Sequence, residues 1–158
     1  MLGNSASAAA SSQEISILLV DGDSIGRERL QLGLSMERFQ VSAFGDSESG
    51  LYHMGIEKPS LVILRLPPRY AEDDEVTRRF REATPAPLIV LADEQDHWVQ
   101  AENLRQGADY VLPSSVSLRE LRARIRALAW RSQTPHLPGR TALPGFQDRP
   151  VAPRQAHD

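Results

Sequence analysis

Two acidic residues stand close together after the first apolar run, where their carboxylates could bind a metal ion. In the stretch "VDGDS", Asp21 and Asp23 are separated by a single residue, and with Gly26 they resemble the start of a calcium-binding loop. Such a loop needs an oxygen ligand where Ile25 stands and a closing glutamate where Leu32 stands. Because both residues are apolar, we reject calcium binding by this segment.

A permanently charged arginine ends a later apolar run, "PSLVILRLPP", which is unexpected in a strand bound for a core. The apolar residues before it, bounded by proline, predict a short strand buried on both faces. Arg65 therefore stands at the carboxyl end of that strand. In open α/β sheets, sites are built at this edge. His53 and His97 are isolated in amphipathic segments, and we assign them no catalytic or ligand role.

From residue 15 onward, short apolar runs alternate with longer amphipathic segments. The runs predict strands at 15–20, at 40–44, in the stretch that ends at Arg65, at 86–91 and at 108–112. The amphipathic segments predict helices at 24–36, 46–56, 72–83, 96–107 and 117–131. Five strands alternating with helices predict a doubly wound parallel α/β sheet.

Several helix ends carry their own signals. Ser24 and Asp46 can serve as N-caps of the first two helices, and the acidic start of the 72–83 helix suits its positive dipole end. Gly107 closes the fourth helix. The inner face of the second helix is predicted at Leu51, Met54 and Gly55.

Composition predicts one domain with loose sequence on both sides. The chain has 158 residues, a net charge of −3 and 41% hydrophobic residues. Residues 1–14 are predicted to be a flexible leader, 15–131 a domain, and 132–158 a Pro-rich disordered tail or linker. Without cysteine, disulfides and thiolate zinc sites are impossible. No apolar run approaches the roughly 20 residues of a membrane helix, so a cytoplasmic location is predicted.

The segment 15–131 resembles the receiver domain of two-component response regulators, especially those with winged-helix DNA-binding partners. The resemblance lies in the order and spacing of "ILLVDGD", "PSLVILRLPP", "PLIVLAD" and "LRQGADYVLPSSVSLRELRARIRALAWR". It implies a flavodoxin-like sheet in the order 2-1-3-4-5, flanked by five helices. It also implies a Mg²⁺ site made by two acidic residues, an aspartate that accepts a phosphoryl group, and a hydroxyl residue and a lysine that contact the phosphate.

This sequence departs from the family at most of those positions. Asp21 matches the first acidic position, but Gly22 stands at the second and Arg65 stands where the phosphoryl-accepting aspartate belongs. Ala92 stands at the hydroxyl position, and an alignment without a gap places Ser114 and Ser115 where Lys-Pro belongs. One inserted residue would instead put Pro113 at the lysine position. A guanidinium opposes a divalent cation and cannot accept a phosphoryl group. We therefore predict no enzymatic activity, no phosphotransfer, no cofactor, and Mg²⁺ binding that is lost or very weak.

Arg65 then has two possible environments. It can pair with Asp21, and also with Asp23 or Asp93, which would make a self-neutralised pocket that locks one conformation. Alternatively, its side chain extends into solvent.

The family's association surface, formed by helix four, strand five and helix five, is predicted to persist as a homodimer face. That region contains Asp109, Glu120, Arg122 and Arg124. The inner, core-facing stripe of the last helix is predicted at Leu121, Ile125 and Leu128. The family's relay from a hydroxyl to an aromatic on strand five is absent, because Ala92 has no hydroxyl. The aromatic position holds Val111, or Tyr110 if the register slips by one residue.

The leading prediction is a phosphorylation-independent receiver that acts as a signalling and dimerisation module. It would control transcription through a domain outside this chain, and it would bind neither nucleic acid nor membrane itself. One alternative is a sensor that binds an anionic metabolite through Arg65 and strand-end amides. Another is a phosphorelay receiver that uses Asp21 or Asp23 as its acceptor.

Overall fold

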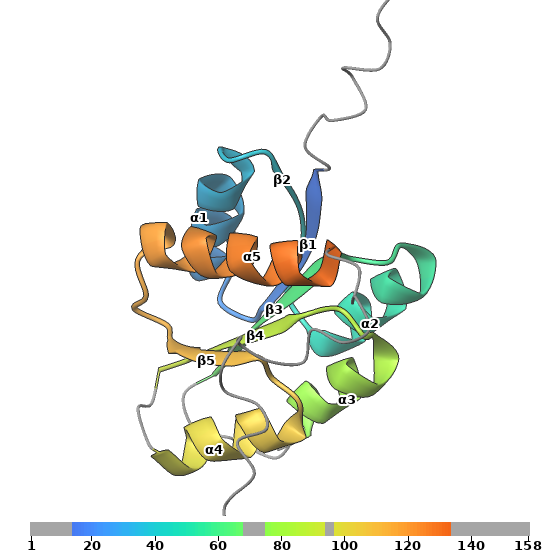
Figure 1. The fold of residues 1–158 in the computed structure, drawn as a ribbon, viewed down its shortest axis with the longest axis vertical. Helices are drawn as coiled ribbons and strands as arrows, with labels where there is room; N and C mark the ends of the chain where they lie inside the picture. Colours follow the sequence, from blue (N-terminus) through green and yellow to red (C-terminus); the bar gives the residue numbers. More distant parts are fainter. Residues whose placement is uncertain (1–13, 68–74, 94–96, 134–158) are drawn as a thin grey trace, which may run out of the picture.

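Five parallel strands form one sheet in the order β2-β1-β3-β4-β5 (Figure 1). The computed structural model describes residues 14–67, 75–93 and 97–133. The strands are β1 (Ile15–Asp21), β2 (Phe39–Phe44), β3 (Leu61–Leu66), β4 (Leu88–Ala92) and β5 (Tyr110–Pro113). The predicted doubly wound sheet and its strand order are confirmed, with strand ends shifted by one or two residues.

Helices cover both faces of this sheet (Figure 1). They are α1 (Ser24–Ser35), α2 (Ser47–Ile56), α3 (Val76–Ala83), α4 (His97–Gln106) and α5 (Leu118–Gln133). Helices α1 and α5 lie on one face, and α2, α3 and α4 on the other. In the described ranges, no helix has the length and apolar character needed to span a membrane.

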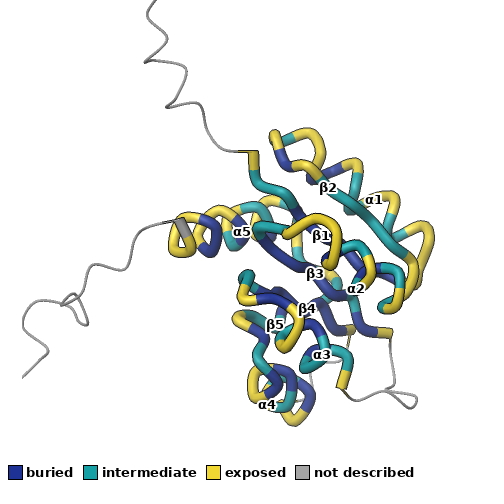
Figure 2. Tube along the Cα trace, turned by 90° about the vertical axis from the view of Figure 1, so that its right-hand side faces the viewer, coloured by how far each residue is buried: buried dark blue, intermediate teal, exposed yellow. Residues whose placement is uncertain are grey.

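Each face of the sheet has its own apolar core, which explains why the strands are continuous apolar runs. Ile17 and Leu19 of β1 pack toward α1 and α5, whereas Leu18 and Val20 pack toward α2 and α3. Figure 2 shows the resulting band of buried residues along β1, β3 and β4. Alternate side chains of a strand point to opposite faces, so a strand with helices on both sides must be apolar throughout. The predicted inner stripe of α5 is confirmed, since all three residues are buried.

The helix ends correct some predictions and confirm others. The N-cap of α1 is Asp23, not Ser24, because the Asp23 carboxylate accepts a hydrogen bond from the Gly26 N–H at 3.1 Å. Asp46 caps α2 as predicted, and the hydrogen bonds from Ser49 lower the pKa of the Asp46 carboxyl. Gly107 follows α4 with a φ of 119°, a left-handed conformation that favours glycine.

The predicted acidic start of α3 is not supported. Residues 72–74 lie outside the described residues, and the helix begins at Val76 with no acidic residue in its first turn. Glu75 occupies the cap position without a side-chain cap. Residues 1–13 and 134–158, which contain nearly all of the predicted leader and tail, also lie outside the described residues. Helix α5 extends to Gln133, two residues beyond the predicted domain end at 131.

The inner face of α2 passes through Gly50 and Met54, so the assignment of Gly55 to that face was wrong. A Cβ atom on Gly50 would lie 2.7 Å from Val20 Cγ2 and 3.4 Å from Phe80 Cζ, whereas a Cβ on Gly55 would meet nothing within 4 Å. Gly50 therefore allows α2 to approach the sheet closely.

These contacts predict opposite effects for one substitution at the two glycines. Gly50→Ala should destabilise the fold by about 1–3 kcal/mol, because the core around it is filled. Gly55→Ala should be neutral or stabilising by up to about 1 kcal/mol, because alanine favours helix. Urea denaturation of both variants measures the difference. Equal stabilities would contradict the close packing of α2 at Gly50.

Candidate functional site

The predicted site residues meet at the carboxyl edge of the sheet, where β1, β3 and β4 end. Asp21 lies opposite Arg65 in the β1–β3 ladder, and Leu66 lies opposite Ala92 in the β3–β4 ladder. Asp23 and Asp93 follow the ends of β1 and β4. Because parallel strands end at the same edge, side chains from distant parts of the sequence come together here.

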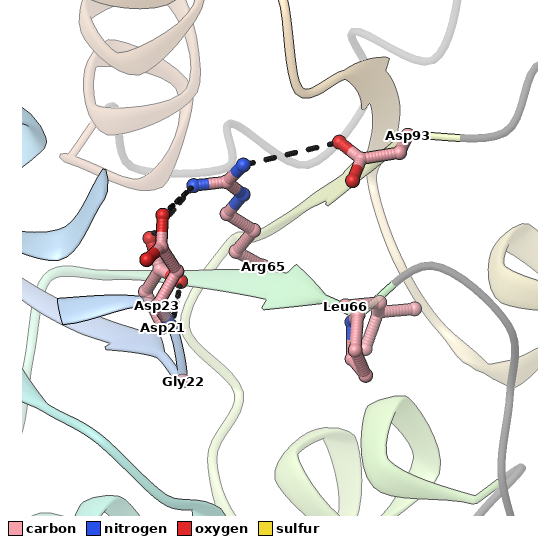
Figure 3. Close-up of a pocket in the computed structure, with 7 residues that line it drawn as sticks. Asp21, Gly22, Asp23, Arg65, Leu66 and Asp93 are labelled. Atoms are coloured by element: carbon pink, nitrogen blue, oxygen red, sulfur yellow. Dashed lines mark hydrogen bonds and ion pairs between the residues drawn. The ribbon is translucent and has the colours of Figure 1, made fainter. Parts of the chain in front are cut away.

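The Arg65 guanidinium lies among three carboxylates (Figure 3). Its Nη1 is 3.3 Å from Asp21 Oδ2 and 3.5 Å from Asp23 Oδ2, and its Nη2 is 3.9 Å from Asp93 Oδ1. The Arg65 side chain is only 24% exposed. The arginine thus adopts the paired arrangement and does not extend into solvent.

Asp21 is the most constrained member of this cluster. The residue is 1% exposed, so its charge requires partners within the protein. Its Oδ1 accepts a hydrogen bond from the Asp23 N–H at 2.9 Å, and its Oδ2 accepts one from Arg65 Nη1 at 3.3 Å. Both carboxylate oxygens are therefore satisfied by the chain itself.

Gly26 makes room for the guanidinium, a role that the sequence analysis missed. A Cβ atom on Gly26 would collide with Arg65 Nη1, and it would lie 2.9 Å from Asp23 Oδ2 and 3.1 Å from Asp21 Oδ2. Glycine is unfavourable within a helix, and this one lies in the first turn of α1. That unfavourable placement was the available signal, but it does not reveal that a side chain from β3 fills the space.

The remaining predicted positions surround this cluster. Gly22 lies beside Asp21, and Ala92 is buried at the end of β4. Pro113 lies opposite Ala92 in the β4–β5 ladder, and Ser114 follows it. The Ser114 N–H donates to the Ala92 carbonyl at 3.1 Å, while its Oγ is buried without a hydrogen-bond partner. The lysine position of the family therefore holds Ser114 in the alignment without a gap and Pro113 in the alignment with one inserted residue, and neither is a lysine.

The cluster borders a pocket of about 150 Å³, lined by Asp21, Gly22, Asp23, Arg65, Leu66, Pro67 and Asp93. The residues do not fit a divalent cation, because a guanidinium nitrogen lies within 3.5 Å of the two carboxylates that would have to hold it. Within the described ranges, no group of three or more His, Cys, Asp or Glu side chains is arranged to hold a metal ion.

The residues predicted to form a dimer face do not all lie together. Glu120 and Arg124 pair at 3.6 Å, and the Arg124 guanidinium lies 4.8 Å from the centre of the Tyr110 ring. Asp109 lies beside α3, where its carboxylate accepts from the Leu88 N–H at 2.8 Å and lies 3.6 Å from Arg81. These residues already have partners within the chain.

Arg122 differs from the others, because it pairs with Glu37 next to α1 at 3.3 Å. It therefore lies on the α1 side of α5, away from Tyr110, and the structure does not group it with Glu120 and Arg124. The two candidate aromatic-relay positions also separate: Tyr110 packs against the core under α5, and Val111 against the core on the other face.

Known proteins resemble this chain in both sequence and fold, although no protein-family model matches it. Transcriptional regulatory protein AfsQ1 of Streptomyces coelicolor is 31% identical over 118 residues, which cover 75% of this chain and 52% of that protein. The chain thus spans about half the length of this curated relative.

Two solved structures share the fold. A two-component response regulator from Clostridium difficile has a TM-score of 0.70 at 19% identity, covering 76% of this chain and 99% of that one. An atypical orphan response regulator, described as having a phosphorylation-independent regulatory mechanism, has a TM-score of 0.64 at 23% identity. That match covers 73% of this chain and 96% of the other.

The strand order and the five flanking helices are those of the flavodoxin-like receiver fold. Together with the sequence similarity to AfsQ1, this fold identifies the chain as a response regulator receiver domain.

The close approach of Arg65 to Gly26 predicts the direction in which Gly26→Ala changes the stability of the protein. Helix propensity alone would make Gly26→Ala stabilising by up to about 1 kcal/mol. We expect it instead to destabilise the protein by about 1–3 kcal/mol, because it displaces the Arg65 guanidinium from its charged hydrogen bond with Asp21. Urea denaturation and the side-chain NMR signals of Arg65 measure the effect.

Two controls isolate the cause. Gly22→Ala changes a glycine in the connection just before α1. Its added Cβ would meet only the Gly45 carbonyl, at 3.7 Å, so stability should change little. In an Arg65→Ala background, the penalty of Gly26→Ala should shrink. An unchanged penalty in that background would mean that Gly26 does not act through Arg65.

Proposed function

We propose that this receiver works without phosphorylation, as a non-enzymatic signalling and interaction module. The observation that carries the proposal is the position of Arg65, whose guanidinium lies within ion-pair distance of Asp21, Asp23 and Asp93. In this proposal, a cation that belongs to the chain takes the place of the exchangeable metal ion that the family resemblance implies.

The same residues argue against phosphoryl transfer at this edge. A guanidinium stays protonated and has no usable lone pair, so Arg65 cannot act as a phosphoryl acceptor. Ala92 has no hydroxyl, and neither Pro113 nor Ser114 supplies the positive charge of a lysine. Asp21 is a poor alternative acceptor because it is buried and paired, and Asp23 is engaged as the cap of α1.

The ion pairs also connect parts of the fold that a phosphorylation switch would have to move. Arg65 links the end of β3 to the ends of β1 and β4 and, through Asp23, to the first turn of α1. The Arg65–Asp21 contact is a charged hydrogen bond, a kind that contributes about 1.5–3 kcal/mol, and the two longer, more exposed ion pairs add about 0–1 kcal/mol each. We propose that they hold the receiver in one conformation, so that its output depends on its partners and on its abundance in the cell.

The output we propose is regulation of transcription through a separate effector domain. AfsQ1 is a transcriptional regulatory protein of which this chain matches about half, and the orphan response regulator structure is described as phosphorylation-independent. The receiver itself is proposed to contact proteins and not nucleic acid, because the chain carries a net charge of −3.

We propose a homodimer through the face formed by α4, β5 and α5. Glu120 and Arg124 lie on the outer side of α5 beside Tyr110, where a second copy could exchange their internal pair for pairs between subunits. On α4, Trp98 is 61% exposed and Leu104 is 49% exposed, so this helix has apolar area that a second copy could cover. Arg122 has no part in this proposal, since it pairs with Glu37.

Light scattering on the full chain, before and after incubation with acetyl phosphate or beryllofluoride, tests the proposal. We expect a dimer under all conditions and no incorporated phosphate by mass spectrometry. A phosphorylated protein, or an oligomeric state that follows the phosphodonor, would refute phosphorylation independence.

Charge reversal tests the dimer face separately. Arg124→Glu places a second negative charge beside Glu120 and should produce a monomer, with a dissociation constant raised at least about tenfold. Arg131→Glu, an equal charge change at an exposed position in the last turn of α5, should leave the dimer intact. If the two variants behave alike, the dimer face lies elsewhere.

A further inference from the structure

Arg65 separates two pockets that differ in charge. On one side lies the pocket of about 150 Å³ with Asp21, Asp23 and Asp93 in its lining. On the other side, between the first turns of α1 and the connection from β5 to α5, lies a pocket of about 310 Å³. Arg65 and Asp23 line both, so the two pockets share a wall made of charged side chains.

The charges favour an anion only in the larger pocket. Of the three charged residues in its lining, Arg65 and Asp23 pair with each other at 3.5 Å, so Arg29 supplies the net positive charge. In the part of the chain that the structure describes, the Arg29 side chain makes no hydrogen bond or ion pair. The smaller pocket has three carboxylates and one guanidinium, so an anion there would meet net repulsion.

A polar group without a partner also belongs to the larger pocket. Ser114 is part of its lining, and the Ser114 Oγ is buried with no hydrogen-bond partner. If the Ser114 side chain rotates toward the pocket, a ligand oxygen would accept the hydroxyl proton and give this buried group the partner that it lacks. The Ser115 residue next to it adds a second hydroxyl group to the lining.

The rest of the lining is largely apolar. It includes the side chains of Ile25 and Leu30 from α1 and of Val116 and Leu118 from the start of α5. A volume of about 310 Å³ is at the lower end for small-molecule sites. The pocket therefore combines a cationic and hydroxyl-bearing part with an apolar wall.

We propose that this pocket binds a small organic anion, with a carboxylate or phosphate-ester head contacted by Arg29 and Ser114 and an apolar body against the wall. A head group that also engages Arg65 would compete with the carboxylates of the edge cluster, which gives the ligand a route to loosen the ion pairs there. The proposal goes beyond phosphorylation independence and does not depend on it, because it requires only the pocket.

The test is titration of the isotope-labelled full chain with phenyl phosphate, phenylacetate and neutral benzyl alcohol, followed by amide NMR. We expect both anions to shift signals of residues 25–30 and 114–118 at millimolar concentration, and benzyl alcohol to have little effect. The anion that binds with the higher affinity identifies the preferred head group, phosphate ester or carboxylate. Inorganic phosphate, which lacks the apolar body, should bind more weakly than phenyl phosphate.

Variants assign the binding to the proposed residues. Arg29→Gln should weaken binding of the anions about tenfold, the loss expected for one charged contact, and Ser114→Ala should weaken it less. Arg131→Gln removes the same charge from an exposed helix position far along α5 and should bind like the wild type. Because Arg29 is exposed, its replacement should leave the fold intact.

Several results would overturn the proposal. They are the absence of saturable shifts with both anions, equal binding by the wild type and Arg29→Gln, or shifts confined to Gly22 and Asp93 on the acidic side. None of them bears on whether the receiver accepts a phosphoryl group, which the acetyl phosphate experiment decides alone.

Discussion

The structure depends on one constraint, the burial of the Asp21 carboxylate at the end of a central strand. A charged side chain that is only 2% exposed must be compensated by a cation or by hydrogen bonds, and the neighbouring strand supplies Arg65. Two other features of the edge follow from that pairing. Gly26 leaves the guanidinium its space, and Asp23 both caps α1 and contributes a second carboxylate to the same arginine.

A resident cation changes what this edge can do. A metal ion exchanges with solvent and can be joined by a phosphoryl group, whereas a guanidinium attached to β3 has a fixed charge and a fixed position. In our proposal, the edge contributes to stability and conformation, and not to chemistry that depends on an exchangeable metal ion. We propose contacts to other molecules at two places, the surface of α5 beside Tyr110 and the larger pocket next to Arg29.

Apolar runs were enough to predict the strands and the doubly wound sheet, and they placed Asp21 and Arg65 at the same edge because parallel strands align their carboxyl ends. Whether Arg65 pairs with Asp21 or extends into solvent remained open until the structure showed the pair. Details set by three-dimensional packing were not predictable. The role of Gly26 depends on a side chain that arrives from β3, and the inner face of α2 turned out to include Gly50 in place of Gly55. The N-cap of α1 differed by one residue, since two adjacent residues could each cap the helix. The position of Arg122 depends on Glu37, which is distant in sequence.

Calorimetric titration of Mg²⁺ into the wild type and an Arg65→Ala variant, side by side, tests the central claim most directly. If the guanidinium takes the place of an exchangeable cation, the wild type gives no saturable heat at millimolar Mg²⁺, and the variant, left with Asp21, Asp23 and Asp93 without a counterion, gains measurable binding. Saturable Mg²⁺ binding by the wild type with an affinity equal to that of the variant would contradict the account.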